Sequence, residues 1–390
     1  MLEKPKILLI GPTPPPYHGV SVSMQTLLTS PLAESFRLMH LDISDRREIS
    51  HVDQPDLHDV FLFIKQFLRS FALILRERPA LCYLPISQTR LGFFRDSLFM
   101  LPALLSRIPV IVHLHGANFD TMYSGSGLFW RVYMGFILRR VSHFIVLGEM
   151  LRPIFNRWAS PDKISVVSNG VSLDTDQNKP ARVSRNNGKP FRVIFLSSLN
   201  RQKGLFVLLQ AVPLVLKEKT DVEFFIAGPW WGDKTRKEAE EFVRAFGLAR
   251  NVFFIGRVTG RQKCNFLRTG DVFVFPGVQQ EGQPITVLEA MGAGLPVIAT
   301  DRGCLRETVI DGITGFIVPP GSPEALAKKV IELIHCPALL ESMAANALKR
   351  VESLYTAERF ASRMSEVFHH TVAVASARRT INFGLDAGHD

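Results

Sequence analysis

The chain has 390 residues, of which 46% are hydrophobic and 21% charged. That length exceeds one ordinary core, so two domains of about 150 to 200 residues each are expected, and the composition excludes a disordered chain. Lys and Arg outnumber Asp and Glu by 46 to 36, a formal charge of +10. This excess suits sugar nucleotides, lipid phosphates or an anionic membrane face. Nucleic acid is disfavoured because no basic cluster is interleaved with aromatic residues at motif spacing.

Cysteine usage and the apolar runs bear on the location of the protein. The four cysteines are far apart and form no CxxC pair, which indicates reduced thiols in a cytosol and neither a zinc site nor a disulfide framework. They are Cys82, Cys264, Cys304 and Cys336. The N-terminal apolar run is broken by Pro12, too early for a signal peptide. Residues 60–75 and 98–114 contain basic residues or prolines, so neither is predicted to span a membrane.

The first half of the chain alternates strand-like and helix-like stretches. Strands are predicted at residues 6–11, 36–43, 80–86, 109–116, 143–148 and 163–170, and helices at 23–28, 57–78, 93–105 and 129–141. Continuous apolar strands that alternate with helices favour a doubly wound parallel sheet. Residues 1–174 are therefore predicted to form one Rossmann-like domain. The polar stretch 175–190 is predicted to be a linker.

The second half repeats this alternation, and residues 191–355 are predicted to form a second Rossmann-like domain. Strands are predicted at residues 191–198, 222–228, 251–258, 271–276, 295–300 and 314–318, and helices at 203–218, 234–247, 262–270, 284–291, 322–335 and 338–354. The last part, residues 356–390, is predicted to be a helix followed by a frayed tail. The fold class is therefore α/β.

Residues 271–300 form a predicted βαβ unit around which candidate chemistry gathers. Its first loop opens at the carboxyl edge of the sheet, where open α/β folds bind ligands. Pro284 suits the first helical position, and the free N–H groups of that helix start can face an anion. Glu289 lies five residues beyond Pro284, about 7 to 8 Å further along the helix. A carboxylate at that distance suits hydroxyl groups.

A nucleotide sugar has this arrangement of groups, with a diphosphate between a ribose and a hexose. Glu289 would accept hydrogen bonds from the ribose, the helix start would hold the diphosphate, and Glu281 would accept from the hexose. The ordinary alternative is that both glutamates are solvated surface residues.

The stretch EGQPITVLEAMGAGLPVIAT, from Glu281 to Thr300, resembles the Glu-x7-Glu signature of the family 4 retaining glycosyltransferases of GT-B fold. The resemblance implies two Rossmann-like domains facing a cleft, with the end of the chain crossing back to pack on the first domain. It implies a donor site formed by Glu281, Gly282, Gln283, Pro284, Ile285 and Glu289.

Further donor contacts are implied by the loop after residues 191–198, which supplies an Arg and a Lys to the diphosphate in this family. Lys203, followed by a glycine, matches the Lys, but Ser198 stands where the Arg falls. Arg201 is the candidate replacement, because a guanidinium binds phosphate in bidentate fashion; the alternative is a solvated Arg201. Gly256 and Arg257 end another strand, where relatives contact the nucleobase through the backbone.

In the first domain the family carries a Gly-Gly pair in the loop after the opening strand. Here the pair is His18 and Gly19, so only Gly19 matches and allows a close backbone approach. A plain strand-to-helix turn is the alternative. His115 ends the strand at 109–116 and resembles the acceptor-side histidine of the family, whereas His113 has no such match.

This resemblance implies a cytoplasmic retaining glycosyltransferase that moves a hexose from a UDP-sugar or GDP-sugar to a hydroxyl of a glycan or lipid-linked acceptor, in cell-surface polysaccharide synthesis. His115, Glu281 and Lys203 are the predicted catalytic residues, with Lys203 and the helix dipole stabilising the leaving diphosphate. The donor is a substrate; no cofactor and no metal site are expected. The helices at 57–75 and 127–141 mix aromatic and basic residues, so each either touches an anionic membrane or packs on the sheet.

Two other classes of protein compete with this prediction. A non-catalytic protein of the same fold that binds a nucleotide or glycan within a polysaccharide assembly stays open because of Ser198 and His18. A dinucleotide oxidoreductase is disfavoured, since the first loop, GPTPPPYHG, lacks the G-x-G-x-x-G pattern.

Overall fold

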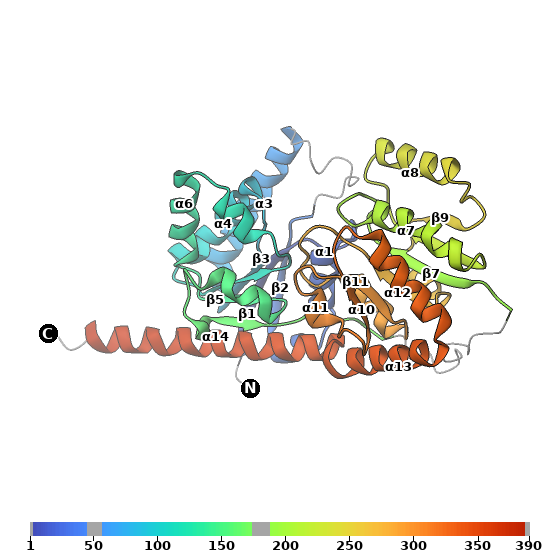
Figure 1. The fold of residues 1–390 in the computed structure, drawn as a ribbon. Coiled ribbons are helices and arrows are strands. Elements are labelled where there is room, and N and C mark those ends of the chain that lie inside the picture. Colours follow the sequence, from blue (N-terminus) through green and yellow to red (C-terminus); the bar gives the residue numbers. More distant parts are fainter. Residues whose placement is uncertain (1–2, 45–56, 174–187, 387–390) are drawn as a thin grey trace. The chain divides into compact units, whose positions relative to one another are not determined.

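The computed structural model describes residues 3–44, 57–173 and 188–386 (Figure 1). The chain divides into two compact units. Unit 1 comprises Met1–Gly170 and Ala357–Asp390, and unit 2 comprises Val171–Thr356. The sequence places these boundaries after residues 174 and 355 instead. Residues 175–187 of the predicted linker lie outside the described residues.

Unit 1 contains a six-stranded sheet in the order β2-β1-β3-β4-β5-β6, with all pairs parallel. Its strands are β1 (Lys6–Gly11), β2 (Arg37–Asp42), β3 (Leu81–Pro85), β4 (Val110–Leu114), β5 (His143–Val146) and β6 (Ile164–Val166). Its helices are α1 (Gly19–Leu28), α2 (Leu32–Ser35), α3 (Leu57–Glu77), α4 (Arg90–Leu105), α5 (Phe119–Ser124), α6 (Leu128–Leu138) and α14 (Ala357–Asp386), with 3-10 helices at Glu149–Phe155 and Pro161–Lys163.

The final helix, α14, belongs to the core of unit 1. Phe360, Met364 and Phe368 recur every fourth residue, which places them on one face of a helix. All three are buried, in one cluster with Ile7 of β1. The ring of Phe368 meets that of Phe36 edge-on at 5.9 Å. Unit 1 is therefore completed by a segment that follows unit 2 in the chain.

Unit 2 contains a second sheet of six parallel strands, in the order β12-β11-β10-β7-β8-β9. Its strands are β7 (Phe191–Leu196), β8 (Val222–Ala227), β9 (Val252–Gly256), β10 (Val272–Phe275), β11 (Val297–Thr300) and β12 (Gly315–Val318). Its helices are α7 (Leu205–Glu218), α8 (Asp233–Ala245), α9 (Gly260–Arg268), α10 (Ile285–Gly292), α11 (Leu305–Thr308), α12 (Pro323–His335) and α13 (Pro337–Leu354). This is the dinucleotide-fold order.

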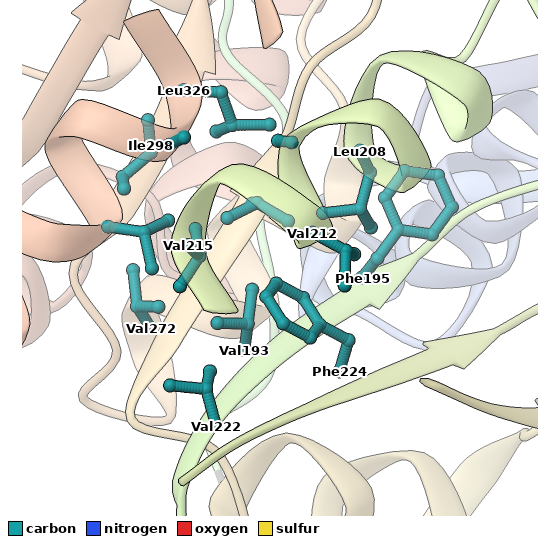
Figure 2. Close-up of a cluster of buried hydrophobic side chains, with 14 of the residues drawn as sticks. Val193, Phe195, Leu208, Val212, Val215, Val222, Phe224, Val272, Ile298 and Leu326 are labelled. Carbon is teal, nitrogen blue, oxygen red and sulfur yellow. The ribbon is translucent and has the colours of Figure 1, made fainter. Parts of the chain in front are cut away.

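The core of unit 2 lies between α7 and the strands it covers (Figure 2). Leu208, Val212 and Val215 follow the three- and four-residue spacing of a helix face, and all are buried. They meet strand residues such as Val193 and Phe224. The alternation of apolar helix faces and continuous apolar strands thus builds the sheet whose edge carries the candidate site.

The predicted fold class, two doubly wound parallel sheets, is confirmed. The short helices α2, α5 and α11 are absent from the prediction, because four to six residues cannot display a helical period. Helix α1 begins at Gly19, four residues before the predicted start at residue 23.

Candidate functional site

The strand order of unit 2 reverses between β7 and β10. These strands are neighbours, with Val193 paired to Val272, and open α/β sheets bind ligands at the carboxyl ends of strands at such a point. The loop after β7 carries Lys203, and the loop after β10 carries Glu281. The topology therefore brings together two predicted site residues that lie 78 positions apart.

The two loops make a close backbone contact at Gly204. This residue has a φ of 85°, and a Cβ atom there would lie 2.0 Å from the carbonyl oxygen of Pro276. Beside it, the amide of Val278 donates to the carbonyl of Gln202 at 2.9 Å. Only glycine combines this φ with so close an approach. Gly204 thus allows Lys203 to reach the loop after β10.

Lys203 and Glu281 form an ion pair. The Nζ atom of Lys203 donates to both carboxylate oxygens of Glu281, at 2.7 and 2.9 Å, and Gln279 Nε2 donates to Oε1 at 2.9 Å. The amide of Lys203 donates to Asn200 Oδ1 at 2.7 Å, which fixes the start of the lysine loop. The Lys203 and Glu281 side chains are 23% and 10% exposed. An anion that bound here would compete with Glu281 for the ammonium group.

The Glu281 loop rests on the turn that follows β11. Gly303 has a φ of 54°, and a Cβ atom there would lie 1.7 Å from the carbonyl oxygen of Glu281. The Gly303 amide donates to Gln280 Oε1 at 3.0 Å, and the Cys304 amide donates to the Gly282 carbonyl at 3.3 Å. These contacts show that the turn fixes the position of the backbone of the Glu281 loop.

The start of α10 differs by one residue from the prediction. Pro284 has an extended ψ of 121°, so it precedes the helix, and Ile285 is the first helical residue. Gln283 is buried and donates its side-chain amide to Thr308 Oγ1 at 3.1 Å, so that amide faces the protein. No side chain caps α10, and its first turn holds no acidic residue. The Val287 and Leu288 amides donate to the Pro284 carbonyl at 3.1 and 3.5 Å, so the N–H groups that precede these bonds, those of Ile285 and Thr286, are the ones that suit an anion.

Glu289 lies one turn further along α10 and pairs with Lys263 of α9. Lys263 Nζ donates to Glu289 Oε1 at 2.5 Å, and the side chains are 22% and 18% exposed. Burial raises the pKa of the Glu289 carboxyl, and Lys263 acts against that rise. The start of α10 thus has a lysine–carboxylate pair at the preceding loop and another within the helix.

Arg201 is directed at α8. Its Nη2 donates to Glu238 Oε2 at 2.7 Å, its guanidinium lies 4.1 Å from the centre of the Phe206 ring, and its side chain is 65% exposed. Its role as a phosphate ligand stays a prediction, because it would first have to leave Glu238.

Gly256 is the last residue of β9, which lies on the side of β8 opposite β7, and Arg257 follows it. Gly256 has a φ of 79° and accepts a hydrogen bond from the Gly228 amide at 2.9 Å. Arg257 is exposed. Their proposed contact with a nucleobase also stays a prediction.

In unit 1, three histidines gather near the ends of β1 and β4. The rings of His113 and His115 lie 4.0 Å apart, and His113 Nδ1 is 2.9 Å from the hydroxyl of Tyr83. His115 Nδ1 is buried and has no hydrogen-bond partner among the described residues. Burial lowers the pKa of His115 to about 3, and the nearby His18 contributes. His115 is therefore neutral at physiological pH.

The loop after β1, which carries the His18–Gly19 pair, ends in the capped N-terminus of α1. His18 precedes α1; its Nδ1 accepts from the Ser21 amide at 3.3 Å, and Ser21 Oγ accepts from the His18 amide at 3.1 Å. A Cβ atom on Gly19 would meet nothing within 4 Å. No contact with the described part of the chain requires a glycine there, so among these residues the space beside it is open.

The histidines of unit 1 predict an acid-sensitive fold. The pKa values of His115 and His143 are lowered by burial to about 3 and about 4. Below pH 6.5 their unfolded forms bind protons that the folded forms do not. The free energy of unfolding should therefore fall by roughly 1.4 kcal/mol per pH unit for each histidine between pH 6.5 and 4.5. Chemical denaturation at a series of pH values measures how steeply the free energy of unfolding falls with pH. This fall should be less steep in His115→Asn than in wild type, by the contribution of one histidine, and equal slopes for the two proteins would contradict the prediction.

Several supporting residues were not predicted: Asn200, Lys263, Gln279, Gly303 and Thr308. Gly303 follows a predicted strand, where a turn glycine is a recognisable signal, but the others belong to no motif. Among the residues that the structure describes, no group of three or more His, Cys, Asp or Glu side chains could hold a metal ion. None of the described helices is both long and apolar enough to cross a bilayer.

Comparison with known proteins places this geometry in context. The model of the family described as Glycosyl transferases group 1 matches residues 176–350. Phosphatidyl-myo-inositol mannosyltransferase of Mycobacterium tuberculosis is 30% identical over 293 residues, which is 72% of each chain. The Mycobacterium leprae enzyme of that name is 32% identical over 214 residues, 54% of each chain, so the match spans about half of its length. The capsular polysaccharide biosynthesis glycosyltransferase CapM of Staphylococcus aureus is 24% identical over 88% of this chain and 93% of CapM.

Solved structures share the fold. HepE of Anabaena, in complex with UDP-glucose, superposes with a TM-score of 0.74 at 18% identity, covering 94% of this chain and 100% of HepE. A glycosyltransferase of Rickettsia africae gives a TM-score of 0.73 at 16% identity, with 95% and 99% coverage.

Proposed function

Because this chain belongs to the group 1 glycosyltransferases, we propose that it transfers a hexose from a nucleoside diphosphate sugar to an acceptor hydroxyl. The acceptor is a glycan or a lipid-linked saccharide of the cell surface, and the configuration of the transferred sugar is retained. The GT-B fold and the bacterial relatives that act in capsule synthesis or on phosphatidyl-myo-inositol support this proposal.

The observation that carries the donor assignment is the uncapped start of α10 between two lysine–carboxylate pairs. The diphosphate would bind the free N–H groups and draw Lys203 away from Glu281. The released Glu281 carboxylate would then accept from hexose hydroxyls, while Glu289 accepts from the ribose. Lys203, with the positive end of the helix dipole, would stabilise the charge that develops on the leaving diphosphate.

Unit 1 is proposed to bind the acceptor beside His115. Because burial lowers the His115 pKa to about 3, its imidazole is neutral and would orient the attacking hydroxyl through a hydrogen bond. Attack occurs on the face from which the diphosphate departs, so that a phosphate oxygen lies beside the attacking hydroxyl and takes its proton. The C–O bond to the acceptor forms as the bond to the diphosphate breaks.

The same unit exposes an apolar surface that suits a membrane. On α3 the side chains at 61, 64, 68, 71 and 75 are 42% to 67% exposed, a three- and four-residue spacing that forms one stripe. The polar Gln66 and Ser70 face inward instead. Lys65, Arg69 and Arg76 are exposed beside the stripe, and residues 61–76 contain no acidic residue.

Two neighbouring helices extend this apolar and basic surface. Helix α4 packs on α3, where Phe99 meets Phe63, and on α6, where Phe94 meets Trp130. Figure 1 shows the three helices next to one another in unit 1. Exposed apolar residues continue on both helices: Leu91, Phe94, Leu105, Leu128, Phe129, Val132 and Phe136. An apolar face flanked by cations without acids is typical of a helix that lies in an anionic lipid interface. Peripheral docking on a cytoplasmic membrane face is therefore part of the proposed function.

Vesicle flotation tests the docking surface. Wild type should float with vesicles that contain phosphatidylglycerol and far less with vesicles of pure phosphatidylcholine. The Ile64→Glu variant should bind the vesicles at least about tenfold more weakly, because burying an isoleucine side chain contributes roughly 1.5 to 3 kcal/mol. Ile313→Glu is the matched control, because Ile313 is 53% exposed in unit 2 and Ile64 is 48% exposed. Equal flotation of both variants, or a dimer that Ile64→Glu disperses, would overturn membrane docking.

Thermal unfolding with UDP, GDP, ADP and their sugars tests the donor assignment. A ligand that binds only the folded protein raises the free energy of unfolding by about 2.7 kcal/mol when its concentration is a hundredfold above Kd. The nucleotides of one base should stabilise wild type, and they should stabilise Glu289→Ala much less. The control variant Glu332→Ala, on α12, should respond as wild type does. If no nucleotide acts, the donor assignment fails. If the nucleotide binds but no diphosphate is ever released from its sugar, the non-catalytic alternative is correct.

A further inference from the structure

Lys263 is a charged residue of the candidate site that no motif assigns. It lies on α9, and its Nζ atom reaches across to Glu289 Oε1 on α10. Both side chains are more than three-quarters buried. A surface ion pair contributes little, but a pair at this depth loses much of its hydration, so each partner depends on the other.

The second oxygen of Glu289 has no such partner. Glu289 Oε2 is buried and accepts no hydrogen bond from any residue that the structure describes. A buried acceptor without a donor is unfavourable, so this oxygen is suited to a hydroxyl from outside the chain. By occupying Oε1, Lys263 determines which oxygen stays available.

Helix α13, which also packs on α10, places its Arg350 away from Glu289. On α13, Arg350 donates to the carbonyls of Thr308 and Glu307, at 3.0 and 2.7 Å, and so faces the α11 segment. Lys263 is the charged group that acts on the Glu289 carboxyl. Its loss would leave that carboxylate buried and unpaired.

We propose that Lys263 is a positioning residue for the donor: it holds Glu289 so that Oε2 accepts from a ribose hydroxyl of the bound nucleotide. This inference rests on the proposed function, because it needs a nucleoside diphosphate at the start of α10. Lys263 acts through Glu289 and does not contact the nucleotide itself.

Calorimetric titration separates this role from a direct contact. The ligands are the nucleoside diphosphate that stabilises wild type and its 2′,3′-dideoxy analogue, which lacks the hydroxyls that Glu289 would bind. Lys263→Met should bind the ribonucleotide about tenfold more weakly, the effect of about one hydrogen bond to a charged group, and should bind the dideoxy analogue as wild type does. Lys263→Arg should restore most of the affinity. In a Glu289→Gln background Lys263→Met should have no further effect.

Each contrary result identifies what is wrong. Equal losses for the two ligands would mean that Lys263 touches the phosphate or the base. An unchanged affinity would leave only a structural ion pair and would spare the proposed function. If no nucleoside diphosphate binds wild type, the proposed function itself fails. Lys329→Met is the matched control, since Lys329 also pairs with a glutamate of unit 2 and is 30% exposed. If Lys263→Met does not fold, titration of Lys263→Arg and Glu289→Gln with both ligands still tests the role of Lys263.

Discussion

Replacing Lys203 by Met is expected to lower kcat by about a thousandfold, the effect of removing one preorganised group that stabilises transition-state charge. Its ammonium group is the partner of Glu281 and the cation proposed to meet the leaving diphosphate. Release of nucleoside diphosphate from the donor sugar, in the presence of acceptor, measures this effect. The donor KM should change less than kcat, because the charge on the bridging oxygen grows as the bond breaks.

Two comparison variants give the Lys203 result its meaning. Lys329→Met removes a similar ion-paired lysine of unit 2 and should retain full activity. Arg201→Met removes the exposed cation two residues away, which pairs with Glu238. If Arg201→Met loses as much as Lys203→Met, Arg201 supplies the second phosphate contact despite its ion pair with Glu238. A Lys203→Met enzyme within tenfold of wild type would contradict its proposed catalytic role.

Replacing Gly303 by Ala is expected to destabilise unit 2 by roughly 3 kcal/mol or more, through backbone strain and overpacking together. The φ of 54° disfavours any side chain, and the new Cβ would lie 1.7 Å from the carbonyl oxygen of Glu281. The Glu281 loop must therefore move. Chemical denaturation should show the lower stability, and titration should show weaker nucleotide binding.

Gly321→Ala isolates the effect of the conformation alone. Gly321 has a φ of 74°, and a Cβ atom there would meet nothing within 4 Å. This variant should therefore lose only about 1 to 2 kcal/mol and should bind nucleotide normally. If Gly303→Ala binds nucleotide as well as Gly321→Ala does, the turn after β11 does not set the Glu281 loop.

The sequence predicts the frame of the molecule well because its signals are local. Continuous apolar strands alternate with helices, and the predicted βαβ unit at 271–300 corresponds to β10, α10 and β11. The carboxyl ends of β7 and β10 then hold Lys203 and Glu281 at one place. Within that unit the start of α10 is wrong by one residue, because the sequence pattern does not distinguish a proline at the N-cap from one at the first helical position, and the two differ in ψ.

The partners within the site could not be predicted, because they depend on how helices and loops distant in sequence pack together. Lys263 and Glu289 are 26 residues apart on two helices, and no periodicity gives the register between them. Arg201 finds Glu238 on α8 for the same reason. The unpartnered oxygen of Glu289 follows from burial, which spacing does not report.

The most direct test of the central claim is a crystal structure of the protein with the nucleoside diphosphate that stabilises it. The diphosphate should lie on the first N–H groups of α10, with Lys203 on a phosphate oxygen and no longer on Glu281. Glu289 Oε2 should accept from a ribose hydroxyl while Oε1 keeps Lys263. A nucleotide bound elsewhere, or one bound with the Lys203–Glu281 pair intact and Glu289 untouched, would contradict the donor site proposed for this chain.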